Sequence, residues 1–135
     1  MSDDILRLLP QKPPMVFITG VRKTDEHSAT CWFDITGQTP FVRNGVLNEA
    51  VLIEVAAQTT SVHFHQSRSQ EAQSEGYIIE VKNFTTGRPL KVGERIVATA
   101  TVVKILPPFG MYDVEIFNDD GEKLGAGSLK FYKED

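Results

Sequence analysis

Apolar residues recur with helical spacing in one long segment of the chain, residues 44–65. At about 100° per residue, one face of the predicted helix collects positions three or four residues apart. These positions are Leu47, Ala50, Val51, Glu54, Ala57, Gln58, Ser61 and His65. The face is apolar except for Glu54, Gln58 and its C-terminal end. We expect this helix to be the central element of the fold, with Gly45 near its start and Asn48 as its N-cap.

The rest of the chain is dominated by residues that favour strands. Strands are predicted at residues 15–23, 28–35, 77–86, 95–106, 111–117 and 122–132, with a short helical turn near residues 5–9 and a loop over residues 36–44. A strand pair, one long helix and then three or four antiparallel strands indicate an α+β fold. We expect one long central helix wrapped by a curved antiparallel sheet of five to six strands, in a single domain of residues 1–135.

A carboxylate lies in the middle of the apolar helix face. Burying an ionised carboxylate is costly unless it is hydrogen-bonded or protonated. Glu54 therefore either reaches solvent, pairs with Gln58 one turn later, or acts as an acid or base that faces a ligand pocket. Glu49 is the competing acid, but it lies about 140° around the helix from Glu54 and is expected to be solvated.

Composition narrows the classes of function. The formal net charge is −4, which disfavours nucleic-acid binding as the main role. No segment approaches the ~20 apolar residues that span a membrane, and the N-terminus lacks the pattern of a secretory signal, so a cytoplasmic protein is expected. Cys31 is the one cysteine, and its strand-like surroundings predict a buried structural thiol. No metal site and no cofactor are indicated.

Three short motifs follow one another along the chain: LLPQKPPM at residues 8–15, EVAAQ at residues 54–58, and KNF at residues 82–84 followed by PLKVGE at residues 89–94. In this order they resemble the 3-hydroxyacyl-acyl-carrier-protein dehydratases and their small relatives in polyene-type lipid clusters. The resemblance implies the hotdog fold and a 3-hydroxyacyl-thioester dehydratase of fatty acid or polyene-type lipid biosynthesis. It also implies a glutamate and a histidine that face each other across a dimer interface.

The sequence departs from this family at the expected histidine. Residues 38–44 read QTPFVRN where the dehydratases carry a His-Phe-Pro-Gly motif, and Gln11 replaces the histidine of the opening motif. The chain has three histidines, His27, His63 and His65. We expect each of them to be a polar surface or helix-end residue, with His65 roughly 16 Å along the helix axis from Glu54.

The helix face and the resemblance together give a candidate site. Acid–base chemistry is assigned to Glu54 and Gln58. Substrate binding is assigned to Phe41, Asn44, Gly45, Val46, Ala50 and Ala57. Phe41, Val46, Ala50 and Ala57 are expected to line a tunnel between subunits, and backbone N–H groups of Gly45 and Val46 at the helix start would polarise the thioester oxygen. A cationic rim that would steer an acidic acyl-carrier protein is assigned to Arg43, Lys82, Arg88 and Lys91.

The substrate carrier is thus an acyl-carrier protein or coenzyme A, and three functions remain open. The first is a dehydratase in which Glu54 works with Gln58 and with Asn44 or Arg43. The second is a hotdog thioesterase in which Glu54 activates water or attacks directly. The third is a catalytically inactive acyl-binding subunit of a heterodimer. In each case we expect a homodimer, a higher multiple or a heterodimer with a homologue, because a long exposed strand edge favours pairing.

Overall fold

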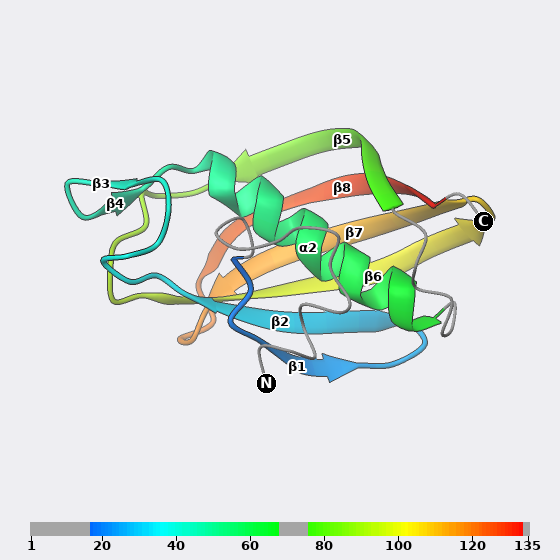
Figure 1. Ribbon diagram of the computed structural model, residues 1–135, viewed down its shortest axis with the longest axis horizontal. Coiled ribbons are helices and arrows are strands. Elements are labelled where there is room, and N and C mark those ends of the chain that lie inside the picture. The colour runs from blue at the N-terminus through cyan, green and yellow to red at the C-terminus, as the bar shows by residue number, and fades with distance from the viewer. Residues whose placement is uncertain (1–16, 68–75, 134–135) are drawn as a thin grey trace.

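The computed structural model describes residues 17–67 and 76–133. In this part of the chain one helix, α2 (Ala50–Ser67), lies across a curved antiparallel sheet (Figure 1). The strands of the sheet are β1 (Gly20–Thr24), β2 (Ser28–Asp34), β5 (Gly76–Thr86), β6 (Arg95–Leu106), β7 (Phe109–Asn118) and β8 (Lys123–Lys133). A separate pair of short strands, β3 (Val42–Arg43) and β4 (Val46–Leu47), comes directly before the helix.

The six strands of the main sheet follow the order β1-β2-β6-β7-β8-β5, and every neighbouring pair is antiparallel. This is the predicted arrangement of a helix wrapped by a curved sheet. The helical turn predicted near residues 5–9 lies outside the described residues. The strand predicted at residues 111–117 begins two residues earlier, since Phe109 and Gly110 already belong to β7.

The first strand begins later than the sequence predicts, at Gly20. The physical reason is that two backbone N–H groups before it have another partner. Phe17 N–H donates to the side-chain oxygen of Gln58 at 2.9 Å, and Ile18 N–H approaches the same oxygen at 3.4 Å. Pairing with β2 starts only where Thr19 N–H donates to the carbonyl of Trp32 at 2.8 Å.

The helix is buried on more sides than the sequence predicts. Every residue from Val55 to His65 is buried, including the polar ones, because the sheet curves around the helix and the helix contacts five of its strands. Polar side chains in this stretch are accommodated by nearby acceptors. The hydroxyl of Thr59, for example, donates to the carbonyl of Val55 at 2.8 Å. A single apolar face was therefore the wrong prediction for the C-terminal half of the helix.

The core lies between the helix and the concave face of the sheet. Most of its described members come from the helix and from strands β2, β6, β7 and β8, and include Leu52, Val55, Ala56, Phe64, Ile96, Ala98, Ile116 and Phe131. Gly110 shows how close the packing is, because a Cβ there would lie 2.7 Å from the ring of Phe64. Cys31 is buried as predicted, and burial raises the pKa of its thiol to about 12, so the thiol stays protonated.

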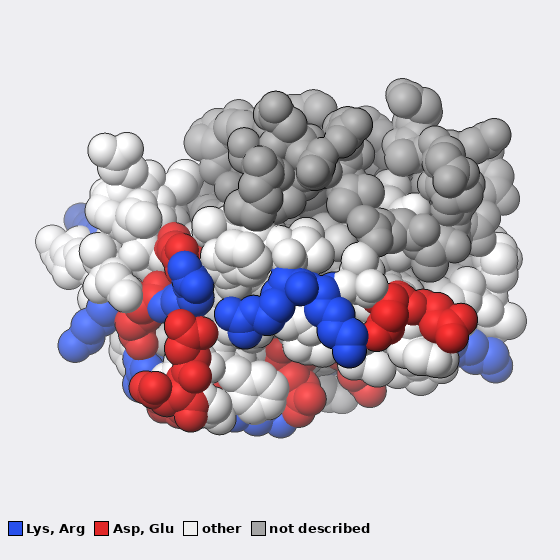
Figure 2. All heavy atoms as spheres, turned by 90° about the horizontal axis from the view of Figure 1, so that it is seen from below, with Lys and Arg blue, Asp and Glu red and all other residues white. Residues whose placement is uncertain are grey.

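The surface mixes charges of both signs. On the face seen from below, groups of Lys and Arg atoms lie beside groups of Asp and Glu atoms (Figure 2). This mixture fits the net charge of −4.

His63 and His65 are buried, so neither is a surface residue, although His65 does lie in the last turn of the helix, as predicted for a helix-end residue. His63 and His65 have 1% and 4% of their surface exposed, whereas His27 lies exposed in the β1–β2 turn. A hydrogen bond of 2.7 Å joins His63 Nδ1 to the hydroxyl of Tyr112 on β7. Burial raises the pKa of Tyr112, so its hydroxyl keeps a proton that it can donate to neutral His63.

Burial also lowers the pKa of His63, although the nearby carbonyls of Glu26 and Asp25 and the Asp25 carboxylate act in the opposite direction. As the pH falls below about 6.5, the unfolded chain takes up a proton at this position before the folded chain does. We therefore expect the free energy of unfolding to fall between pH 7 and pH 5, by up to about 1.4 kcal/mol per pH unit from this residue. Urea titrations at several pH values give the free energy of unfolding at each pH. Its change with pH should be smaller for His63→Gln than for wild type and unchanged for His27→Gln. Equal changes with pH in all three proteins would contradict the assignment.

The outermost strand β5 presents an apolar edge beside the helix. Ile79 and Val81 on β5 are 51% and 38% exposed, and Ile53 on the helix is 36% exposed. Among the described residues β5 pairs with β8 on one side, and no described strand pairs with its other edge. A long edge of this kind, next to exposed apolar side chains, is typical of a surface that pairs with another chain.

We expect the purified protein to be a dimer or a multiple of a dimer, formed through this edge. Light scattering at micromolar concentration should give at least twice the chain mass. Val81→Asp should shift the mass towards the monomer, because it places a charge on the edge. Val103→Asp on the outer face of the sheet, where the valine is also exposed, is the matched control and should leave the mass unchanged. A monomeric wild-type protein would contradict the expectation.

Candidate functional site

The helix is preceded by a tight hairpin that the sequence analysis treated as a loop. Asn44 and Gly45 both have positive φ, 54° and 77°, which is the conformation of a two-residue type I′ turn between β3 and β4. Gly45 therefore lies in the hairpin turn, five residues before Ala50, and not at the helix start. The prediction that the N–H groups of Gly45 and Val46 lie at the helix start was wrong for this reason. Their contact with substrate stays a prediction.

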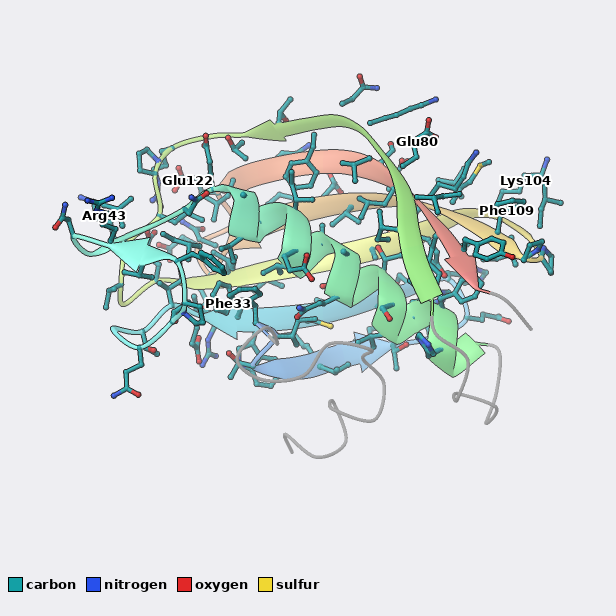
Figure 3. The ribbon with its side chains drawn as sticks, turned by 45° about the horizontal axis from the view of Figure 1, so that its top comes forward. Phe33, Arg43, Glu80, Lys104, Phe109 and Glu122 are labelled. Carbon is teal, nitrogen blue, oxygen red and sulfur yellow. The ribbon has the colours of Figure 1, made fainter. Side chains whose placement is uncertain are left out.

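The hairpin is extended by a third segment. Leu47 N–H donates to the carbonyl of Leu90 at 2.9 Å, and Val92 N–H donates to the carbonyl of Gly45 at 3.0 Å. Val46 forms an antiparallel bridge with Lys91 between these two bonds. We call β3, β4 and residues 90–92 the hairpin platform. It lies at the end of the molecule where α2 begins, and Figure 3 shows its residue Arg43 at the same end as Glu122.

The helix starts as the sequence predicts, with Asn48 as its N-cap. The side-chain oxygen of Asn48 accepts the N–H of Ala50 at 2.9 Å, and its carbonyl accepts the N–H of Val51 at 3.0 Å. These bonds occupy two of the N–H groups that the first helical turn leaves without intrahelical partners. The N-cap fixes the direction in which the first turns carry Glu54.

Glu54 and Gln58 are adjacent on the helix, one turn apart. Gln58 Nε2 donates to Glu54 Oε1 at 3.4 Å, and Gln58 itself is completely buried. Because the carbonyl oxygen of Gln58 accepts the N–H of Phe17, its NH₂ group must point towards Glu54. Gln58 thus holds the half-buried Glu54 carboxylate in one orientation and ties it to the segment before β1.

Glu49 and the histidines are placed away from this pair. Glu49 is exposed and accepts a hydrogen bond of 2.9 Å from the hydroxyl of Thr86, in agreement with its predicted solvated position. His63 and His65 lie roughly 13 and 16 Å further along the helix axis than Glu54. His27 is in the β1–β2 turn, close enough to His63 to affect its pKa. All three histidines therefore lie towards the C-terminal end of the helix, while Glu54 lies near its N-terminal end.

The residues predicted to bind substrate are only partly brought together. Phe41, Asn44 and Val46 line an open hollow on the hairpin platform, together with Val42, Arg43, Leu47 and Asn48. Phe41 is 56% exposed and has a positive φ of 66°, which is unusual for a bulky residue. Ala50 is exposed at the first turn of the helix, whereas Ala57 is buried in the core. The role of this set in binding an acyl chain stays a prediction.

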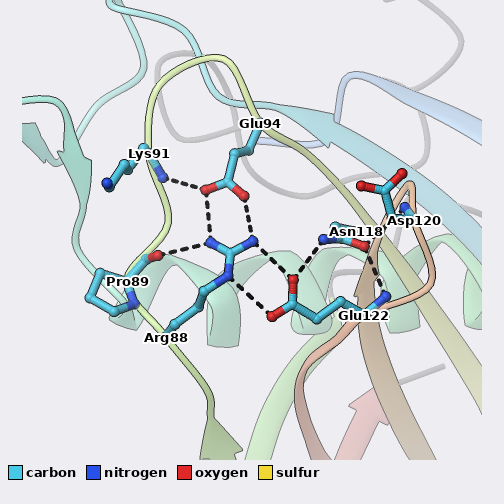
Figure 4. Close-up of polar contacts among 7 residues, drawn as sticks. All are labelled: Arg88, Pro89, Lys91, Glu94, Asn118, Asp120 and Glu122. Atoms are coloured by element: carbon cyan, nitrogen blue, oxygen red, sulfur yellow. Dashed lines mark hydrogen bonds and ion pairs between the residues drawn. The ribbon is translucent and has the colours of Figure 1, made fainter.

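The predicted cationic rim divides into two kinds of residue. Arg88 is held in a network in which its guanidinium bonds Glu94 at 2.7 and 3.1 Å, Glu122 at 3.2 Å and the carbonyl of Pro89 at 3.1 Å (Figure 4). Hydrogen bonds from Arg88 lower the pKa of Glu94. Lys82 lies on β5 and pairs with Glu80 at 3.6 Å. Arg43 and Lys91 form no ion pair with a described residue, and both lie on the hairpin platform.

Sequence reasoning missed the two contacts that position this end of the molecule. The Gln58–Phe17 bond joins residues 41 positions apart, and the Arg88–Glu122 pair joins residues 34 positions apart. For the Glu54–Gln58 pair, the local signal was the helical spacing of the two residues. The Asn44-Gly45 dipeptide was a usable signal for the hairpin, because this pair favours the type I′ turn.

The comparison with known families is decisive at this point. A family model described as ApeP-like, ApeP dehydratase, matches residues 3–135. The chain belongs to the ApeP-like dehydratase family. An uncharacterised thioester dehydrase of Halalkalibacterium halodurans is 24% identical over 131 residues, which cover 93% of this chain and 84% of the relative.

Solved structures support the fold assignment. The dehydratase heterocomplex ApeI:P from Xenorhabdus doucetiae contains a chain that matches with a TM-score of 0.88 at 23% identity, covering 97% of this chain and 91% of that chain. A hypothetical thioesterase from Streptococcus pneumoniae TIGR4, solved with coenzyme A, matches with a TM-score of 0.67 at 12% identity, covering 84% of each chain. At these identities the likeness shows the hotdog fold of this ApeP-like chain. Within the described residues, no helix is both long and apolar enough to span a bilayer.

We expect Gln58→Leu to destabilise the protein by about 1–3 kcal/mol, because it leaves the N–H of Phe17 without its buried acceptor and Glu54 without its neighbour's amide. Thr60→Val is the matched control on the same helix. The hydroxyl of Thr60 is buried without a hydrogen-bond partner among the described residues, so its removal should be neutral or stabilising. Chemical denaturation measures both changes. A Gln58→Leu variant as stable as Thr60→Val would contradict the anchoring role.

Proposed function

We propose that this chain is a subunit of a 3-hydroxyacyl-thioester dehydratase in which Glu54 transfers a proton and Gln58 positions its carboxylate. The observation that carries the proposal is the Glu54–Gln58 pair, with Gln58 fixed by the backbone of Phe17. The pair lies in the EVAAQ segment, in a chain that belongs to the ApeP-like dehydratase family. Fatty acid or polyene-type lipid biosynthesis is the setting that the family resemblance implies, and the cytoplasm is the location that the sequence predicts.

Dehydration needs two proton transfers. A base removes the proton alpha to the thioester, the bond between the β-carbon and the hydroxyl oxygen breaks, and an acid protonates the departing hydroxyl so that it leaves as water. A half-buried carboxylate next to a helix N-terminus is suited to one of these transfers. The carboxylate is already oriented before substrate binds, so the reaction does not have to supply the entropy cost of orienting it.

The second proton-transfer group is proposed to come from a partner subunit. The histidines of this chain are placed towards the other end of the helix, and two of them are buried. Arg43 and Asn44, the earlier candidates for this role, lie on the hairpin platform, and the hollow there is not lined by Glu54. A group from another chain that pairs along β5 would approach the helix from the side where Ile53 is exposed.

The relatives support a partner of this kind. The structure from Xenorhabdus doucetiae is a dehydratase heterocomplex, and a hotdog thioesterase relative was solved with coenzyme A. By analogy, we infer that this chain pairs with itself or with a histidine-bearing homologue, and that its substrate is a thioester of phosphopantetheine. Pairing with the homologue is the arrangement that supplies the second group.

The test is Glu54→Gln, which keeps the shape and hydrogen bonding of the side chain and removes its charge. Wild type and variant are assayed alone and mixed with a histidine-bearing homologue, using one 3-hydroxyacyl thioester as substrate. We expect wild type in the mixture to form the enoyl thioester and the variant to lose at least roughly 100-fold of that rate, a typical contribution of a general acid or base. Glu49→Gln is the control and should retain the wild-type rate.

The products separate the competing functions. Release of free thiol that depends on Glu54 would identify a thioesterase. No turnover in any mixture, with acyl-thioester binding retained, would leave a catalytically inactive acyl-binding subunit. Full enoyl formation by Glu54→Gln would remove Glu54 from the site and direct attention to Glu49.

A further inference from the structure

The outer face of the hairpin platform carries two cations with an apolar residue between them. Arg43 on β3 pairs with Val46 on β4, and Val46 bridges in turn to Lys91. Directly paired residues in an antiparallel sheet project to the same side. The three side chains therefore form one row, and with strands spaced about 4.8 Å apart the two cationic residues are about 10 Å from each other.

The opposite face of the platform fixes this row in place. Val42 pairs with Leu47, and Leu47 is bonded to Leu90. Leu47 and Leu90 are buried in the core, and Val42 packs against it. A one-residue slip would turn these apolar side chains outwards, so the register is strongly determined. The row Arg43–Val46–Lys91 is thus a rigid feature and not a chance arrangement of loop side chains.

The Arg88 network stabilises the third segment of the platform. Glu94, which is bonded to Arg88, accepts the backbone N–H of Lys91 at 2.8 Å (Figure 4). Lys91 also lies close enough to Glu94 to help lower its pKa. Arg88 bonds both Glu94 and Glu122, and Glu94 also interacts electrostatically with Lys91, so it offsets part of that charge. Arg43, Arg88 and Lys91 carry three positive charges against the two carboxylates of Glu94 and Glu122, and Arg43 forms no ion pair with a described residue.

The spacing of the row matches a helix with acidic residues two turns apart. Residues i and i+7 of a helix are roughly 10 Å apart along one face, and an apolar residue at i+3 or i+4 lies between them. Such a helix could place one carboxylate on Arg43, one on Lys91 and an apolar side chain on Val46, which is 36% exposed. Phe41, exposed beside the row in the same hollow, adds apolar surface.

We propose that the row Arg43–Val46–Lys91 is the docking surface for an acidic helix of the protein that carries the thioester. This inference rests on the proposed function, and it names the partner of the same site. The row lies at the end of the molecule where α2 begins, so a carrier docked there delivers its thioester towards Glu54 (Figures 1 and 3). Arg88 and Lys82 are excluded from the docking surface, since carboxylates of this chain already bind both of them.

The test compares two double variants that change the net charge equally. Arg43→Glu with Lys91→Glu reverses the sign of both charges in the row. Lys23→Glu with Lys104→Glu is the control, because both lysines are exposed and lie off the platform, with Lys104 at the opposite end from Arg43 (Figure 3). Calorimetry measures binding of 3-hydroxyoctanoyl acyl-carrier protein and of the same acyl group on coenzyme A, each without turnover.

We expect the row variant to bind the carrier-borne acyl group roughly tenfold or more weakly, a change that two reversed surface charge pairs can supply. Binding of the coenzyme A thioester should stay at the wild-type value, and the control variant should match wild type with both ligands. The conservative variant Arg43→Lys with Lys91→Arg should keep most of the carrier affinity. A midpoint of thermal unfolding equal to that of wild type would show that the row variant is folded.

The outcomes separate this inference from the proposed function. Equal carrier binding by the row variant and wild type would overturn the docking surface and leave the function standing. Equal losses with carrier and coenzyme A thioesters would also overturn it, because the row would then act on the acyl or pantetheine group. Wild-type protein that binds neither thioester would overturn the proposed function and the docking surface together.

Discussion

The side-chain amide of Gln58 connects three parts of the molecule on which the rest of the structure depends. Its oxygen accepts the N–H of Phe17, its NH₂ group donates to Glu54, and its position on α2 is fixed by burial against the sheet. The bond to Phe17 delays the start of β1 and binds the first described segment to the helix. The bond to Glu54 orients the one carboxylate that lies half-buried on the helix. Fold and candidate chemistry therefore share one buried hydrogen-bonding group.

Under the proposed function one chain supplies only part of the site, and the curved sheet explains why. Wrapping the sheet around α2 buries most of the helix, including His63 and His65. The side of the helix next to β5 stays partly open, with Ile53, Ile79 and Val81 exposed. A chain that pairs with this edge covers apolar surface and brings new side chains towards Glu54. Assembly and catalysis are thus expected to depend on the same edge.

Much of the fold could be predicted from the sequence, because its strands have strong local patterns. The strand at residues 95–106 was predicted with its observed bounds, and that at residues 77–86 within one residue. The burial of Ser61 and His65 could not be read from hydropathy, since polar residues in a helix are buried only when distant elements close around them. Of the candidate site, the local spacing of Glu54 and Gln58 predicted that these two side chains lie one helical turn apart and could pair. The Phe17 bond and the Arg88 network depend on the tertiary fold, and only the structure reveals them.

The most direct test of the central claim, that the site is divided between two chains, is a complementation experiment. A histidine-bearing homologue is first inactivated by changing its own helix glutamate to glutamine, and this chain is then added in increasing amounts. The account predicts that enoyl-thioester formation appears on mixing, rises to a maximum at equal amounts of the two chains, and does not appear when the added chain carries Glu54→Gln. Mixed dimers that form but remain inactive with the wild-type chain would contradict it.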